Sequence, residues 1–150
     1  YIYIYMNKGS SMQTCIVTIY PKTVKKQFNE ISHTSFLNEL YVYLLAEKKK
    51  LSYIPKLVKY DIEKRIIVIE NIGTSLDIVN EEEGTPLEDF LPKIKKIYTR
   101  FLKLGLHHND LRWKNIIYNE KLKRIYLIDF EFTSPKFTDK DHDKIVKNIS

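Results

Sequence analysis

The sequence of 150 residues is poor in cysteine and glycine and has no long hydrophobic run. Cys15 is the only cysteine, which excludes an internal disulfide and a zinc site built on cysteines. With four glycines, loops that depend on glycine flexibility are kept to a minimum. No apolar run approaches the roughly 20 residues that cross a bilayer, and the first residues lack a secretion signal. We therefore expect an intracellular, cytoplasmic protein, with the nucleus as an alternative, and no membrane partner.

The composition is that of a folded globular domain with an uneven charge. Hydrophobic residues make up 43% and charged residues 29% of the chain. Residues 1–73 carry 11 Lys and Arg against 6 Asp and Glu, a net +5, while residues 74–150 carry 14 against 13, a net +1. A basic first half suits an anionic partner such as a polyphosphate. The lysine runs "EKKK" and "KKIY" lack interleaved aromatics, so we expect a solvated surface and no nucleic-acid partner.

The first 70 residues alternate in strand fashion around one helix. "QTCIVTIY" and "TVKKQF" predict a hairpin that turns at Pro21, and "YIYIYM" predicts an edge strand before it. A helix follows, with Ser32 or Thr34 as its N-cap. Its apolar stripe has helical spacing: Phe36, Leu37, Leu40, Tyr41, Leu44 and Leu45. "KLVKYDI" and "RIIVIE" then predict a second pair of strands.

The second half reads as a hinge, a helix and a hairpin. "NIGTS" is typical of a hinge and leads into an acidic stretch, "NEEEG". A helix begins with Thr85 or Asp89 as cap and ends at Gly105. The loop "HHNDLRWKN" and the strands "IIY" and "RIYLI" follow. We expect a single domain, 1–150, with one lobe at 1–70, a hinge at 71–76 and a second lobe at 77–150.

Three oxygen-bearing side chains flank the final hairpin. Asp110 and Asn115 bound a short loop, and the strand after Asn115 pairs with the strand that ends at Asp129, so the three can converge. Hard oxygen ligands with open positions suit Mg²⁺, which takes its remaining ligands from water and substrate phosphates. Two carboxylates so close would repel each other unless a cation or a shifted pKa relieved them.

These motifs resemble the signatures of the protein-kinase-like superfamily. "HNDLRWKN" is similar to the catalytic loop H-R-D-L-x-x-x-N, and "IDFE" is similar to D-F-G. The order of Asp110 and Asp129 and their separation by 19 residues agree with it. The resemblance implies an α+β, bilobal kinase-like fold: a small antiparallel sheet with one helix and a much reduced helical second lobe.

The upstream half contains counterparts of the family's ATP-binding residues. The resemblance implies that a strand lysine binds the α and β phosphates and that a helical glutamate holds it. Lys25 and Lys26 both qualify; we favour Lys26, with Glu39 as its partner. Gly9 is the one glycine left where the glycine-rich loop belongs.

The hinge and the tail complete the resemblance. "IENIGTSL" is similar to the segment whose backbone binds adenine, with Glu70 to Ile72 as the contributors. The last residues faintly resemble the tail of the small atypical kinases of the RIO and KEOPS-complex types. Asp143 would there brace the catalytic loop.

The resemblance assigns the remaining roles and implies ATP and Mg²⁺ as cofactors. Asp110 would accept or orient the proton of the attacking hydroxyl, and Arg112 would steady the γ-phosphate. Asn115 and Asp129 would hold Mg²⁺. His108 would be a structural residue beneath the acidic motif.

The sequence departs from the kinase motifs at two positions, and three functions are compatible with it. Asn109 replaces the arginine that receives a phosphorylated activation loop, and Glu131 replaces a glycine, restricting the backbone there. The favoured function is a minimal, constitutive serine/threonine protein kinase with a protein substrate. A small-molecule kinase of the aminoglycoside or choline type and an ATP-binding pseudokinase are the alternatives. A partner that completes the second lobe would be marked by exposed apolar surface on that lobe.

Overall fold

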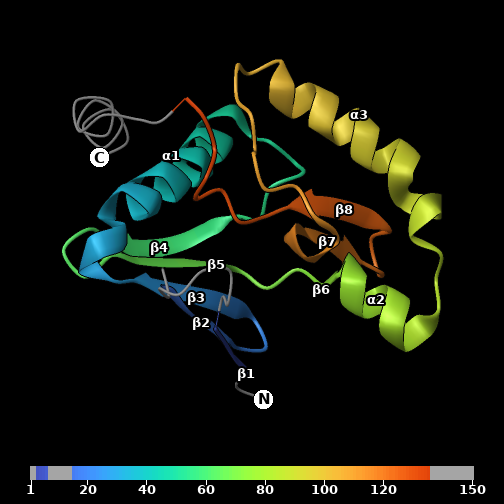
Figure 1. Ribbon diagram of the computed structural model, residues 1–150, viewed down its shortest axis with the longest axis horizontal. Coiled ribbons are helices and arrows are strands. Elements are labelled where there is room, and N and C mark those ends of the chain that lie inside the picture. The colour runs from blue at the N-terminus through green and yellow to red at the C-terminus, as the bar shows by residue number, and fades with distance from the viewer. Residues whose placement is uncertain (1–2, 7–14, 136–150) are drawn as a thin grey trace.

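Alternating residues in the first half of the chain form a five-stranded antiparallel sheet (Figure 1). The structure is a computed structural model that describes residues 3–6 and 15–135. Its strand order is β1-β2-β3-β5-β4, so β1 lies at an edge, as the sequence predicts. The strands are β1 (Tyr3–Met6), β2 (Cys15–Ile19), β3 (Thr23–Phe28), β4 (Leu57–Asp61) and β5 (Ile66–Glu70).

One long helix, α1 (His33–Lys49), packs against this sheet (Figure 1). Ser32 occupies the N-cap position, but its side chain makes no capping hydrogen bond. Of the two N-cap residues that the sequence predicts, Ser32 and Thr34, the structure places Ser32 at the cap position. Asn29 caps the preceding 3₁₀ turn, η1 (Glu30–Ser32), because its Oδ1 accepts the Ser32 N–H at 2.9 Å.

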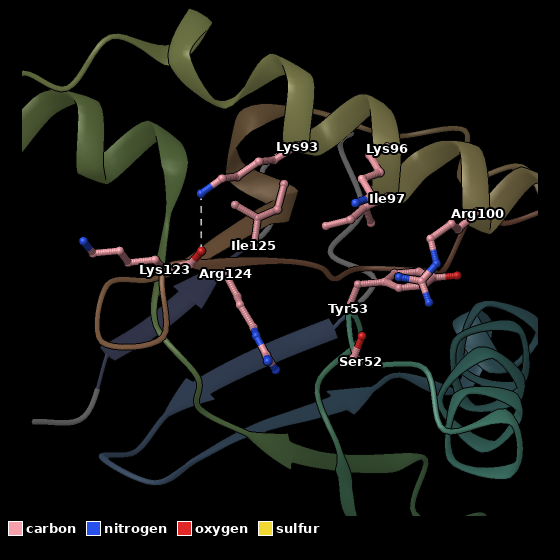
Figure 2. A pocket seen from close by; sticks show the side chains of 9 residues that line it. All are labelled: Ser52, Tyr53, Lys93, Lys96, Ile97, Arg100, Lys123, Arg124 and Ile125. Atoms are coloured by element: carbon pink, nitrogen blue, oxygen red, sulfur yellow. Dashed lines mark hydrogen bonds between the residues drawn. The ribbon is translucent and has the colours of Figure 1, made fainter.

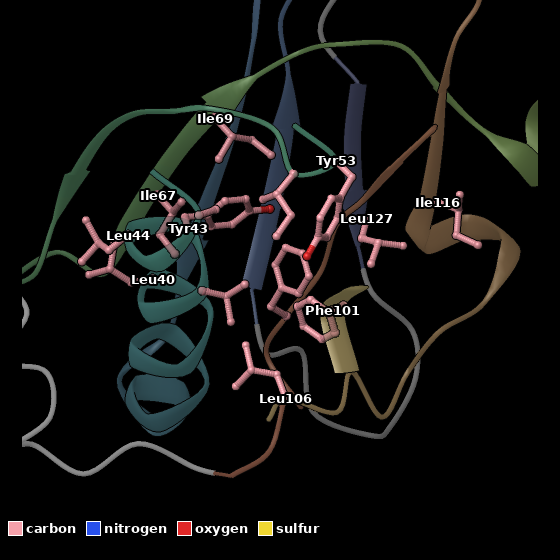
Figure 3. Packing of buried hydrophobic residues seen from close by; sticks show 14 of the residues in the cluster. Leu40, Tyr43, Leu44, Tyr53, Ile67, Ile69, Phe101, Leu106, Ile116 and Leu127 are labelled. Carbon is pink, nitrogen blue, oxygen red and sulfur yellow. The ribbon is translucent and has the colours of Figure 1, made fainter. Parts of the chain in front are cut away.

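The buried surface of α1 is wider than the single stripe that the sequence predicts. Tyr41 and Leu45 of that stripe are only partly buried, whereas Val42, Tyr43 and Ala46 are buried as well. The C-terminal half of the chain covers this second side, and the Phe130 ring meets the Tyr43 ring edge-on at 5.4 Å between centroids. One hydrophobic core thus joins both halves, and it includes Tyr43 and Tyr53 from the first half and Phe101 from the second (Figure 3).

The thiol of Cys15 belongs to the same core. It is 4% exposed, and burial raises its pKa to about 11. A thiol with a raised pKa forms little thiolate at neutral pH and is a poor nucleophile. Cys15 is therefore a packing residue, as the sequence predicts.

A second, three-stranded sheet begins within the predicted hinge (Figure 1). β6 (Thr74–Ser75) pairs with β7 (Ile116–Asn119), which pairs with β8 (Arg124–Leu127). The helix α2 (Leu76–Glu83) follows β6 directly and was missed in the sequence. Its last turn holds three glutamates at the helix end where negative charge is least favourable. Burial of Leu76 and Val79 compensates for this.

The next helix begins later than either predicted cap. A 3₁₀ turn, η2 (Leu87–Phe90), leads into α3 (Leu91–Leu102), which has Pro92 in its first turn and no side-chain cap, so neither Thr85 nor Asp89 caps it. α3 ends near Gly105, as predicted, because Gly105 has a φ of 80° and donates its N–H to the Leu102 carbonyl. In the part of the chain that the structure describes, no helix is long and apolar enough to cross a membrane.

Gly73 lies in close contact with β7. A Cβ atom at this position would lie 2.1 Å from the Tyr118 carbonyl oxygen, and the φ of Gly73 is 155°. Only glycine allows the backbone to approach the strand so closely. The contact fixes the chain where it passes from the first sheet to the second.

We predict that Gly73→Ala lowers the free energy of unfolding by about 2 kcal/mol or more, because backbone must move to admit the methyl group. Gly84→Ala is the matched control: Gly84 also has a positive φ, 66°, but a Cβ there meets nothing within 4 Å. The control should lose only about 1 kcal/mol, the cost of the left-handed backbone. Urea denaturation of both variants measures the difference, and equal losses would contradict the steric explanation.

Candidate active site

A buried ion pair links the first sheet to α1. Lys26 lies on β3 and is 8% exposed, and Glu39 on α1 is fully buried. The Lys26 Nζ donates to Glu39 Oε2 at 2.7 Å and to Oε1 at 2.9 Å. Successive residues of a strand face opposite sides, so Lys25 points away from this pair and is half-buried. The pair explains how a carboxylate is tolerated inside the helix packing.

The same ammonium also contacts the end of β8. Lys26 Nζ lies 3.1 Å from Asp129 Oδ1, so one lysine is shared by two carboxylates. Burial opposes the charge on Lys26, but Asp129 and Glu39 outweigh it and raise its pKa well above the usual value. Burial raises the pKa of Glu39 to about 7, whereas Lys26 holds the pKa of Asp129 below its usual value despite burial. Asp129 is therefore the carboxylate that keeps its charge.

The loop before β7 orients Asp110. The Arg112 guanidinium binds the Asp110 carboxylate through two contacts, from Nε to Oδ1 at 2.9 Å and from Nη2 to Oδ2 at 3.2 Å. The buried side chain of Asn115 donates its amide to the Asp110 carbonyl at 2.7 Å and to Oδ2 at 3.2 Å. Both partners are held by a short turn, η3 (Trp113–Asn115). The Asp110 side chain is thus fixed before any substrate binds.

A backbone contact brings this loop next to Asp129. The Ile128 N–H donates to the Asn115 carbonyl at 3.1 Å. The structure therefore brings together the three predicted oxygen-bearing residues. Lys114, which sequence reasoning missed, helps to lower the pKa of Asp129 from the same loop. Its only signal in the sequence was its position beside Asn115.

His108 lies beneath the loop and is fully buried. Its Nδ1 accepts the Asp110 N–H at 3.2 Å, so its Nε2 carries the proton and donates to the Ile128 carbonyl at 2.8 Å. The ring packs edge-on against Phe130, at 5.4 Å between centroids. Burial lowers the pKa of His108 and keeps it neutral. The ring thus ties the Asp110 loop to the end of β8.

Asn38 is a second residue that sequence reasoning missed. Its side-chain amide is buried and donates to the carbonyls of Phe130 at 3.3 Å, Glu131 at 3.0 Å and Thr133 at 2.6 Å. It is adjacent to Glu39, so neighbouring residues of α1 hold both Lys26 and the chain after Asp129. The sequence signal was a polar residue inside an apolar stripe, which Glu39 next to it obscured.

The structure changes the role expected of Glu131. Positive φ falls on Asp129, at 65°, and not on Glu131, so the glutamate does not strain the backbone where glycine was expected. Its side chain is buried, and its charge contributes to the raised pKa values of Cys15 and Glu39. Its effect is therefore electrostatic.

The remaining predicted residues are placed as follows. Glu70 ends β5, and its N–H donates to the Lys56 carbonyl at 3.0 Å. The next N–H, of Asn71, donates to the Lys22 carbonyl, and Ile72 follows it, partly buried. Gly9 and Asp143 lie outside the described residues.

Comparisons with known proteins agree with this arrangement. The model of the choline/ethanolamine kinase family matches residues 79–142, which include the loop and Asp129. No curated protein matches the sequence significantly.

Solved structures extend the likeness to nearly the whole chain. Monomeric WbdD, described elsewhere as a bifunctional kinase-methyltransferase, is 16% identical with a TM-score of 0.61 over 91% of this chain. The kinase PK-1 of Cydia pomonella granulovirus is 17% identical with a TM-score of 0.60 over 88% of this chain. The matches cover 37% of WbdD and 52% of PK-1, so the chain spans about half or less of each.

We predict that the His108 ring remains neutral, with its proton on Nε2, at about pH 6, where an ordinary histidine is mostly charged. The buried Nδ1 already accepts the Asp110 N–H and cannot take a proton without breaking that bond. Because the unfolded chain takes up this proton and the folded chain does not, His108 makes stability fall as the pH drops below about 6.5. Nitrogen NMR of the imidazole gives both tautomer and charge; a charged ring or a proton on Nδ1 would refute the assignment.

We also predict that Asn38→Leu, which keeps the volume but removes three hydrogen bonds, loosens the chain after Asp129. The amide protons of Thr133 and Ser134 should exchange with solvent at least about tenfold faster. Asn71→Leu is the matched control, because it removes one bond, to the Tyr20 carbonyl, in the first sheet. Unchanged exchange in Asn38→Leu, or an equal effect in the control, would contradict this role.

The site and the fold lead to the same assignment. Two strand ends, a helix and a short loop bring the lysine, the glutamate and the acidic motifs together, as the resemblance implies, and the α+β fold predicted from the sequence is confirmed. A link to the RIO and KEOPS-complex kinases stays a prediction. The chain has the protein-kinase-like fold.

Proposed function

We propose that the chain is a phosphotransferase that uses Mg²⁺ and ATP to phosphorylate a hydroxyl group. The observation that carries this proposal is the position of Lys26, buried and shared between Glu39 and Asp129. An ammonium fixed beside an ionised carboxylate offers one group for phosphate oxygens and one for the metal. A purely structural ion pair would need only one carboxylate.

The donor set at the loop fits Mg²⁺. The hydrogen bond from the Ile128 N–H to the Asn115 carbonyl brings Asn115 near Asp129. Both would supply hard oxygen ligands, and a site with so few protein ligands leaves room for water and phosphate. Asp129 has a lowered pKa, so it is ionised for this task. Bound Mg²⁺ and ATP would supply the transferable phosphoryl group and neutralise its charge. The negative charge that Asp129 keeps is the one that would attract the cation.

The chain's own residues position the reactants. Lys26 would hold the phosphates, with Glu39 keeping it in place. Asp110 would orient the acceptor hydroxyl and take its proton. Arg112 pairs with Asp110 and its side chain is half exposed, so it would be able to contact and steady the γ-phosphate. His108 would fix the loop through its two hydrogen bonds.

The nucleotide base would be held at the hinge. Glu70 and Asn71 use their N–H groups within the first sheet, which favours Ile72 among the residues predicted there. We further propose that Gly9 offers backbone N–H groups to phosphate and that Asp143 braces the loop. The division into lobes at 1–70 and 77–150 remains part of the proposal.

The comparisons bear on the acceptor. The sequence favoured a protein serine or threonine, with a small alcohol as an alternative. The choline/ethanolamine kinase model matches the half that holds Asp110 and Asp129, and we therefore propose a small hydroxyl compound as the acceptor. A protein acceptor and a pseudokinase are outcomes of the same assay.

We predict that Lys26→Met and Asp129→Asn each lower the rate of phosphoryl transfer about a hundredfold or more, because each removes a charge that acts on the phosphates or the metal. Lys25→Met is the matched control: it removes the neighbouring lysine from the same strand and should change the rate by no more than about threefold. The assay measures transfer of labelled γ-phosphate in the presence of Mg²⁺.

The assay is run with choline, ethanolamine, an aminoglycoside and a generic protein as acceptors. Transfer only to protein would return the acceptor to serine or threonine. Binding of ATP without transfer to any acceptor would indicate a pseudokinase. If the wild type neither binds ATP nor transfers phosphate, the proposal that the chain is an enzyme is refuted.

A further inference from the structure

The outer side of α3 and the turn before β8 form a strongly positive surface. Two adjacent hollows of about 280 and about 530 Å³ lie on it. The cations that line the first are Lys93, Lys96, Arg100, Lys123 and Arg124 (Figure 2). Lys95 and Lys103 join Lys96 and Arg100 around the second. We call these seven side chains the basic face.

The basic face carries more positive charge than the whole chain, whose net charge is +6. No aspartate or glutamate lines either hollow, and none of the ion pairs among the described residues involves these seven side chains. Uncompensated like charges raise the local potential and attract anions. The sequence analysis expected the run "KKIY", with Lys95 and Lys96, on a solvated surface; the structure adds Lys123 from the turn before β8 and Arg124, the first residue of β8.

Two of the cations are held in place. The Arg100 guanidinium lies 5.1 Å from the centre of the Tyr53 ring, which is 2% exposed. Lys93 Nζ reaches the Lys123 carbonyl at 3.4 Å (Figure 2). Three separate segments, at 52–53, α3 and 123–125, therefore converge on the first hollow. Side chains that are already ordered lose less entropy on binding than free lysines would.

The chemistry of the lining indicates the class of ligand. Its donors are lysine and arginine side chains, which suit phosphate. Of the apolar residues that line the first hollow, Tyr53 and Ile125 are buried and Ile97 is partly buried, so little anchors a peptide. Tyr53 is the only aromatic residue among those that line the two hollows, and it is buried, so no ring there is free to stack on nucleic-acid bases. Asp110, Asn115 and Asp129 line neither hollow, so the basic face is separate from the site described above.

We propose that the basic face binds a compact ligand that carries several phosphate groups close together. Five cations around one hollow of about 280 Å³ match such a ligand in charge and, against the 300–1,000 Å³ typical of small-molecule pockets, in approximate size. Binding relieves the repulsion among the cations and needs no contact with the nucleotide.

The test uses inorganic tripolyphosphate and isothermal titration calorimetry on the full chain. Lys96→Glu/Lys123→Glu should raise the Kd about tenfold or more, because two phosphate contacts become repulsive. Lys59→Glu/Lys64→Glu changes the net charge equally, at an exposed position on β4 and one in the turn after it, and should leave the Kd within about twofold. Tripolyphosphate could bind at the candidate active site instead of the basic face, and Lys26→Ala removes the proposed phosphate contact there. Binding to the basic face should therefore persist in Lys26→Ala. The Kd should also rise steeply with salt.

Several outcomes overturn the proposal. No binding at millimolar tripolyphosphate would do so, and so would equal weakening by the control pair or loss of binding in Lys26→Ala. A short RNA duplex that binds in place of tripolyphosphate, with a dependence on Lys95 and Lys103, would show an extended nucleic-acid surface instead. Thermal melting of each variant tests whether a loss of the calorimetric binding signal comes from unfolding.

Discussion

The sharing of Lys26 between two carboxylates is the interaction on which the arrangement of the site depends. Glu39 comes from α1 and Asp129 from the end of β8, 103 residues after the lysine. An ammonium buried without a partner would cost several kcal/mol, so the sheet, the helix and the last strand must meet at this point. Glu39 holds the lysine in place, and the lysine in turn keeps the neighbouring Asp129 ionised.

Much of the site could be predicted from the sequence because its signals are local. The spacing from Asp110 to Asn115 and the strand before Asp129 define a loop and a hairpin that need no distant contact to form. The choice of Lys26 over Lys25 follows from strand alternation once one face is known to be buried. The same reasoning located all five strands of the first sheet and the main helix.

What the sequence did not reveal depends on contacts between distant segments. Asn38 meets carbonyls 92 to 95 residues later in the chain, and no local pattern signals that partner. The three glutamates in the last turn of α2 place negative charge at the helix end where it is least favourable, and burial of Leu76 compensates for this. The side-chain cap at this end comes from Asn29, which caps the 3₁₀ turn before α1 and not α1 itself.

The aromatic packing around Phe130 has a consequence for how the molecule can be divided. Its ring contacts Tyr43 of α1 on one side and Phe101 of α3 on the other, at 5.4 and 5.8 Å between centroids. A fragment cut at the hinge would leave one of these rings facing water, and each fragment would lose part of a single core. The two halves should therefore unfold together and should not persist as separately expressed pieces, although the ribbon suggests two modules.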